Sequence, residues 1–147
     1  MSDQATQSIT IAASTVKCFD AVADLEQYPN WAHDIKEAKI RSVDAEGRPS
    51  EVEFRAAAMG RSTRYTLAYD FSSAPAELSW SLVAGDIMRT LDGTYKFMPS
   101  DSVPGGTDIS YHLEVDLVVP LPGFVKRRAE ARIVHTALQE LKALLEG

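Results

Sequence analysis

The chain has 147 residues, 45% of them hydrophobic and 24% charged, which suits one globular domain with a sizeable core. Its net charge of −6 argues against nucleic acid or an anionic membrane as the main partner. Its single cysteine, Cys18, excludes an internal disulfide and a cysteine-cluster metal site, and no apolar run has the length of a membrane span.

The first residues, MSDQATQ, lack a basic segment followed by an apolar one, so we expect no secretory signal and a cytoplasmic location. We predict a flexible lead-in over residues 1–7 and a single domain over residues 8–147. Ile9 and Ile11 alternate as in a strand, and Ser14 or Thr15 can then cap a helix. The apolar residues that would form the buried face of this helix recur every three to four positions: Val16, Phe19, and Val22 or Ala23.

The aromatic stretch that follows allows two interpretations. Tyr28 and Trp31 can pack the short helices against a sheet, with Pro29 ending the first helix, or they can form a lid at a pocket mouth. His33 and Asp34 offer an acid/base pair, but adjacent side chains rarely point the same way. We therefore expect a structural role for the aromatic residues and a surface or capping role for His33 and Asp34.

From residue 35 onward the hydrophobic period changes to about two, which predicts a succession of strands. The predicted strands cover residues 35–43, 51–60, 61–71, 78–83, 87–99 and 107–119, with a hairpin at Gly60. Residues 123–146 predict one long amphipathic helix, and its buried stripe consists of Val134, Ala137, Leu138, Leu141 and Leu145. Together with the strand near Ile9, this predicts an α+β fold in which a curved antiparallel sheet of about seven strands grips the C-terminal helix.

The inward positions of the predicted sheet carry more polar groups than a plain core needs. Tyr65, Tyr69, Trp80, Tyr95 and Tyr111 all fall in the inward phase. A buried hydroxyl without a partner costs about 1–3 kcal/mol, so several on one face suggest a cavity that holds water or ligand. The alternative is that each hydroxyl reaches the sheet edge or a backbone carbonyl.

Two sets of charged residues are candidates for chemistry. Arg89 is in phase with Leu91 and Tyr95, so an unbulged strand would turn it inward, where it can hold an anionic oxygen. Because it directly follows a turn, it can also simply reach water. The alternating His112, Glu114 and Asp116 resemble a metal set, but they occupy the face opposite Tyr111, so we expect a solvated strand face and no metal.

The pieces VADLEQYPNW, LSWSLVAGD, DGTYKF, GGTDISYHLEVD and PGF, in this order, resemble the START-like (SRPBCC) superfamily of helix-grip proteins, which includes polyketide cyclase/dehydrase and coenzyme Q-binding relatives. The resemblance covers about residues 8–145 and implies a deep apolar cavity between sheet and long helix. In similar folds the PLPGF end borders the cavity entrance, so Leu121 and Phe124 are expected to form a hydrophobic gate. The basic run KRRAEAR after it is expected to be a solvated helix face; the alternative is a membrane-docking patch, which the acidic composition of the chain disfavours.

The leading hypothesis is binding or carriage of a small hydrophobic or aromatic ligand that is polyketide-, quinone- or lipid-like, with no cofactor. The predicted ligand-binding residues are Tyr65, Tyr69, Trp80, Arg89, Tyr95, Tyr111, Leu121 and Phe124. The alternative is a polyketide cyclase/dehydratase that acts in the same cavity. This alternative is weaker, because no Asp, Glu or His occupies a clearly inward position on the predicted strands. A third possible function is that of a protein-interaction module. The sequence does not decide between a monomer and a homodimer. We expect no nucleic-acid partner and no integral membrane association.

Overall fold

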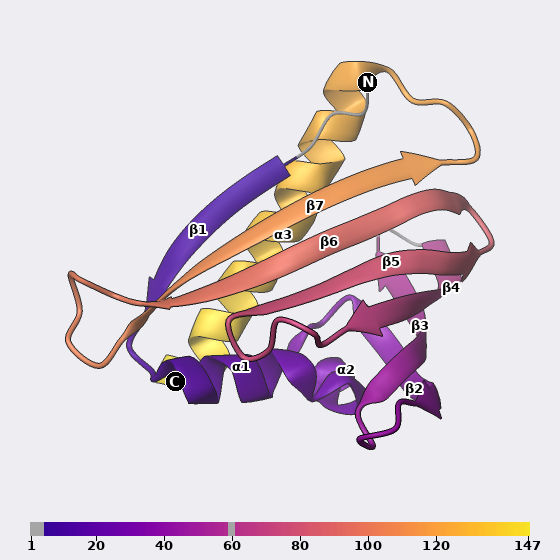
Figure 1. Cartoon of the computed structure of the whole chain (residues 1–147). Helices are drawn as coiled ribbons and strands as arrows, with labels where there is room; N and C mark the ends of the chain where they lie inside the picture. Colours follow the sequence, from indigo (N-terminus) through magenta and orange to yellow (C-terminus); the bar gives the residue numbers. More distant parts are fainter. Residues whose placement is uncertain (1–4, 59–60) are drawn as a thin grey trace.

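The computed structural model describes residues 5–58 and 61–147, which form one curved sheet wrapped around a long helix (Figure 1). The seven strands lie in the order β1-β7-β6-β5-β4-β3-β2, and all neighbours are antiparallel. The strands are β1 (Ala5–Ile11), β2 (Ile35–Val43), β3 (Pro49–Ala58), β4 (Arg61–Asp70), β5 (Glu77–Gly85), β6 (Met88–Pro99) and β7 (Thr107–Leu117). The helices are α1 (Thr15–Ala23), the short 3-10 helix η1 (Leu25–Gln27), α2 (Tyr28–Trp31) and α3 (Gly123–Glu146).

The predicted α+β helix-grip architecture is confirmed, and β2 and α3 have the predicted bounds. β1 begins earlier than predicted, because residues 5–7 of the expected flexible lead-in pair with β7, starting at Ala5 opposite Leu113. The predicted hairpin joins β3 to β4, but Gly60 itself lies outside the described residues.

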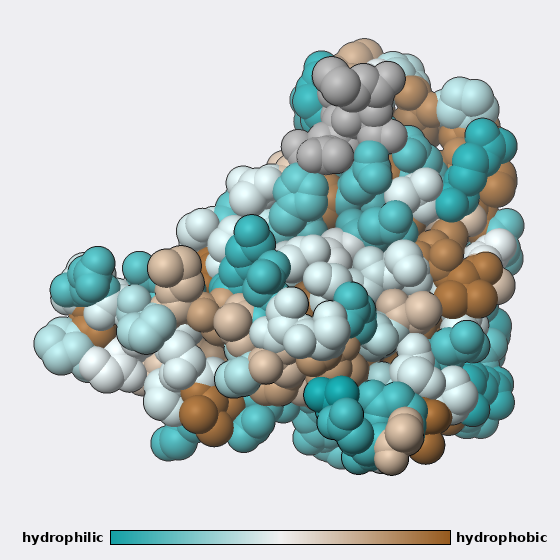
Figure 2. All heavy atoms as spheres, in the orientation of Figure 1, coloured by the Kyte–Doolittle hydropathy of each residue, from teal (hydrophilic) through white to brown (hydrophobic). Residues whose placement is uncertain are grey.

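The long helix α3 packs most closely against β1 and β7 and also touches α1 and α2. Its predicted stripe is confirmed: Val134, Leu138 and Leu141 are buried, while Ala137 and Leu145 are half-buried. The first two turns of α3 are mostly exposed. Figure 2 shows hydrophobic atoms at the corner of the molecule where the chain loops from β7 into α3.

Helix α1 begins at the predicted position, since the Ser14 side chain accepts a hydrogen bond from the backbone N–H of Lys17. The prediction for its buried face is wrong at Val16, which is 60% exposed, whereas Cys18 and Val22 are fully buried. Residues 18 and 22 are one helical turn apart, and position 16 lies about 200° around the axis from position 18, so it points to solvent.

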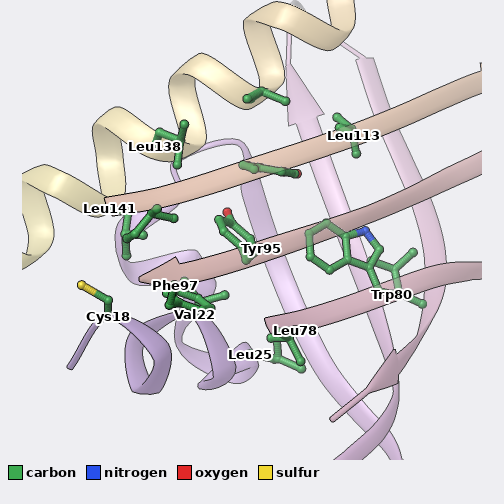
Figure 3. Packing of buried hydrophobic residues seen from close by; sticks show 14 of the residues in the cluster. Cys18, Val22, Leu25, Leu78, Trp80, Tyr95, Phe97, Leu113, Leu138 and Leu141 are labelled. Carbon is green, nitrogen blue, oxygen red and sulfur yellow. The ribbon is translucent and has the colours of Figure 1, made fainter. Parts of the chain in front are cut away.

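The core lies between the concave face of the sheet and the helices. Figure 3 shows Tyr95 and Phe97 on β6 and Trp80 on β5 on the side of the sheet that α3 covers, with Leu138 and Leu141 approaching from the helix. α3 contacts mainly β1 and β7, and the inward side chains of β4 and β5 include the aromatic residues Tyr65, Tyr69 and Trp80.

Candidate functional site

The aromatic residues predicted to face inward form one connected cluster. Tyr65 and Tyr69 come from β4, Trp80 from β5, Tyr95 from β6 and Tyr111 from β7, and alternation along each strand puts them on the same face. The Tyr95 and Tyr111 rings have centroids 4.4 Å apart, and Trp80 lies 5.5 Å from Tyr95 and 5.7 Å from Tyr111. Tyr69 is half-buried and the other four are buried.

Within the described residues, four of the five tyrosine hydroxyls lack a protein partner. The exception is Tyr28, which donates its hydroxyl hydrogen to the carbonyl of Val22 at 2.5 Å. In residues 5–58 and 61–147 the hydroxyls of the other tyrosines make no hydrogen bond, and the only side-chain polar atom that is both sealed from water and unpartnered is Oε1 of Glu130. The four phenol oxygens of the aromatic cluster therefore border space that a water molecule can enter, although their rings are buried or half-buried.

The electrostatics of these phenols follow from their burial. Removal from water raises the pKa of Tyr69, Tyr95 and Tyr111 well above the ordinary value of a tyrosine. Neighbouring phenols raise the pKa of Tyr69 further, since Tyr65, Tyr111 and Tyr95 would repel its anion. The pKa of Tyr65 is raised by burial and, second, by Asp34. All four are thus neutral hydrogen-bond donors at physiological pH, and their hydroxyls lie close enough to influence one another.

A separate cleft of about 430 Å³ opens between β6, the end of β7 and the first half of α3. Its apolar lining consists of Met88, Val115, Leu117, Pro120, Leu121, Ala129 and Ile133, and its charged lining consists of Arg89, Asp116 and Lys126. We call it the α3–β7 cleft. Val115 is four residues from Tyr111 on the inner face of β7, about 13 Å along the strand, and the fully buried Leu113 lies between them, so the cleft and the aromatic cluster are separate regions of one face.

A β-bulge in β6 places Arg89 at the α3–β7 cleft. Met88 is opposite Leu117 and Thr90 is opposite Asp116, so β6 holds one extra residue at position 89. Such a bulge shifts the side-chain phase. Arg89 consequently does not enter the aromatic cluster with Tyr95, as an unbulged strand would predict, and lies exposed at the cleft.

The buried carboxylate of Glu130 was not anticipated. Glu130 lies on α3 with no exposed surface, and its Oε2 accepts the backbone N–H of Val115 at 2.7 Å. Lys126, one turn earlier, is 3.5 Å from Glu130 and 3.1 Å from Asp116, so Asp116 is half-buried and paired with α3 at the cleft. The signal was present in the sequence: position 130 continues the stripe of Val134 by one turn toward the N-terminus.

The other residues that the sequence marked as candidates for function lie at separate places in the structure. Leu121 lines the α3–β7 cleft, whereas Phe124 is 62% exposed and is not among the residues that line it. His33 contacts Glu140 at 2.5 Å on the surface, and His112 contacts the Thr6 hydroxyl at 2.6 Å. A hollow of about 410 Å³ on the outer face of the sheet has only polar residues in its lining, and no predicted ligand-binding residue reaches it.

The aromatic stretch after α1 is structural. The Tyr28 and Trp31 rings are 5.1 Å apart, and Tyr28 also packs against Phe54 of β3. Pro29 is in the first turn of α2 and so starts a short helix, whereas α1 already ends at Ala23. Within the described ranges no group of three His, Cys, Asp or Glu residues is placed to hold a metal ion, and no helix is long and apolar enough to cross a membrane.

Comparisons with known proteins agree with this architecture. The family model described as polyketide cyclase/dehydrase and lipid transport matches residues 2–146. A START superfamily protein from Mycobacterium smegmatis superposes with a TM-score of 0.91 at 23% identity, over 97% of both chains. The Zhui aromatase/cyclase from Streptomyces sp. R1128 superposes with a TM-score of 0.81 at 14% identity, over 99% of this chain and 94% of that one. A protein from Thermus thermophilus reaches a TM-score of 0.81 at 17% identity, over 98% of this chain and 97% of that one. No curated protein sequence matches the chain.

Proposed function

Since the chain belongs to the family of polyketide cyclases/dehydrases and lipid transport proteins, we propose that it binds or carries a small hydrophobic or aromatic molecule in the space beside its aromatic cluster. The observation that carries the proposal is the set of hydroxyls on Tyr65, Tyr69, Tyr95 and Tyr111, which have no protein partner in the described residues but are open to a water molecule. A buried hydroxyl that binds neither protein nor water costs about 1–3 kcal/mol. Water or a ligand is the natural partner for these four groups.

The protonation state of the phenols indicates which functional groups a bound ligand would carry. Because their pKa values are raised, Tyr69, Tyr95 and Tyr111 stay protonated at neutral pH and can donate hydrogen bonds. The aromatic faces around them favour a flat or apolar body. A ligand with carbonyl oxygens on an apolar frame, such as a quinone or a polyketide, satisfies both requirements better than a plain hydrocarbon chain does.

The other predicted residues receive roles at the entrance. The α3–β7 cleft is on the same face of β7 as the aromatic cluster, about 13 Å from Tyr111 along the strand. We assign Leu121 to its apolar rim and Arg89 to contact with any anionic oxygen that a ligand presents there. Phe124 is assigned to the outer side of the same entrance, because it follows Leu121 by three residues and is exposed.

Native mass spectrometry of the purified protein tests the proposal. We expect a bound small molecule that organic extraction releases and whose composition includes carbonyl oxygens. Tyr111→Phe should retain less of it, because that variant removes one of the four hydroxyls that have no protein partner in the described residues. Tyr28→Phe is the matched control: its hydroxyl is bonded to Val22, so retention should stay at the wild-type level. Equal retention in all three proteins, or no bound molecule under any expression condition, contradicts the proposal.

The alternative proposal is a cyclase or dehydratase that works in the same space. Neutral phenols that donate to a carbonyl can stabilise an enolate oxygen, which is what an aldol cyclisation needs. That reaction also requires a base, and Glu130 has both carboxylate oxygens sealed away from solvent. Incubation with a short poly-β-carbonyl thioester distinguishes the two: an enzyme yields a cyclised product with turnover, and a carrier binds the chain unchanged.

A further inference from the structure

The loop between β7 and α3, together with the first turn of α3, exposes an uninterrupted run of apolar residues. The run spans residues 118–125, has the sequence VVPLPGFV, and contains no charged or hydrogen-bonding side chain. All eight residues are exposed, with Val119 at 65% and Phe124 at 62%. Single exposed apolar residues are ordinary on a protein surface, but eight in sequence at one corner of the molecule mark a contact surface. Figure 2 shows the hydrophobic atoms at this corner. We call this run the apolar tip.

The residues that follow the apolar tip carry a net positive charge, opposite in sign to that of the whole chain. Residues 126–133 contain Lys126, Arg127, Arg128 and Arg132, and their only acidic residue, Glu130, is fully buried and contacts Lys126. This segment has a formal charge of +3, whereas the whole chain has −6. Arg128 and Arg132 are exposed and make no hydrogen bond or ion pair with any part of the chain that the structure describes.

The spacing of these groups suits the depth of a lipid headgroup layer. Phe124, Arg128 and Arg132 are four residues apart on α3, so they follow one side of the helix at intervals of about 6 Å. Interfacial segments bury their apolar residues about 5–10 Å deep and keep cationic side chains at the phosphates. The apolar tip also borders the α3–β7 cleft through Pro120 and Leu121, so a docked protein would present that cleft to the bilayer.

We propose that the apolar tip and the arginines Arg128 and Arg132 form a docking surface for the face of an anionic lipid bilayer. The net negative charge of the chain makes this docking weak and reversible, because the acidic remainder is repelled at long range. At contact the local arginines dominate, since physiological salt screens charges beyond about 8 Å. The proposal concerns a surface that includes none of the aromatic cluster, so it stands or fails independently of whether that cluster binds a ligand.

Vesicle co-sedimentation tests the docking surface. The wild-type protein is incubated with phosphatidylcholine vesicles and with vesicles that also contain phosphatidylglycerol, at low and high salt. We expect binding to the anionic vesicles that weakens as salt rises. Each arginine near an anionic surface contributes roughly fivefold to the partition coefficient, so Arg128→Gln with Arg132→Gln should lower it about 10- to 30-fold. Val118→Ser with Val119→Ser should lower it several-fold through lost apolar insertion.

Matched controls remove the same kinds of group elsewhere. Lys17→Gln with Lys39→Gln removes two exposed cations, and Val43→Ser with Met98→Ser removes two exposed apolar side chains. Both should bind the anionic vesicles within about twofold of the wild type. The proposal is overturned if the wild type binds neither kind of vesicle, or if control and tip variants lose binding equally. It is also overturned if light scattering shows a dimer that Val118→Ser with Val119→Ser dissociates while vesicles bind nothing, since a second copy would then occupy the tip.

Discussion

Replacing Glu130 by alanine should destabilise the protein far more than an ordinary glutamate on the same helix would. The Glu130 carboxylate is fully buried and accepts the Val115 N–H at 2.7 Å, at the end of β7 beyond its pairing with β1. A hydrogen bond to a charged acceptor contributes about 1.5–3 kcal/mol and the orphaned N–H adds a desolvation cost of about 1–3 kcal/mol, but the loss of the buried, unpartnered Oε1 relieves a penalty of about 1–2 kcal/mol. In the Glu130→Ala variant Lys126 keeps its ion pair with Asp116 at 3.1 Å, so the loss of the Lys126–Glu130 contact adds little to the loss of stability.

We therefore expect Glu130→Ala to lower the free energy of unfolding by about 2–4 kcal/mol. Glu140→Ala is the matched control: Glu140 is on the same helix and also accepts a backbone N–H, that of His33 at 3.2 Å, but at an exposed site where water can replace the carboxylate. Such surface interactions contribute about 1 kcal/mol or less. Glu130→Gln keeps an acceptor for Val115 and should fall between the two. Urea unfolding followed by far-UV circular dichroism gives all three values. If Glu130→Ala costs no more than Glu140→Ala, the reasoning about the buried carboxylate is refuted.

Three further predictions concern the aromatic cluster and α1. Burial raises the pKa of every tyrosine of the chain, so tyrosinate absorbance should be absent from the folded protein near pH 10 and appear together with unfolding. The free energy of unfolding then falls above pH 10, because only the unfolded chain loses these protons there. The decrease is up to about 1.4 kcal/mol per pH unit for each tyrosine. A phenol that titrates normally in the folded protein contradicts this prediction. Gly93→Ala would place its Cβ 2.4 Å from the Trp80 ring, so it should cost about 1–3 kcal/mol and shift the tryptophan emission; unchanged emission and stability would show that the ring does not lie there. Ser14→Ala removes the N-cap of α1 and should cost about 1 kcal/mol in thermal or urea unfolding, whereas Ser102→Ala, in a surface loop, should cost less than half of that.

The fold was predictable because its periodicities are clean. In β7 the strict alternation around Tyr111 fixes which face is buried, and on α3 the spacing of Val134, Leu138 and Leu141 fixes the helix and its orientation. The proline and glycine residues at 120–123 mark where one period ends and the other begins.

The candidate site was predictable only where a residue follows its period. The tyrosines of the aromatic cluster are together because strand alternation puts them there. Arg89 is exposed, which is the second of its two predicted positions, because β6 bulges there; a bulge cannot be recognised from side-chain types alone. The burial of Glu130 could be inferred from its position on the stripe of α3, but its partner could not, because sequence patterns do not reveal which backbone amides of β7 the neighbouring strand leaves unpaired. The division between aromatic cluster and α3–β7 cleft depends on how α3 lies across the sheet, which is a property of packing.

A high-resolution crystal structure of the protein as purified tests the central claim most directly. The account predicts ordered density, from water or a retained molecule, within hydrogen-bond distance of the hydroxyls of Tyr65, Tyr69, Tyr95 and Tyr111. Hydroxyls that donate to protein carbonyls, with neighbouring side chains filling the space between them, would contradict it.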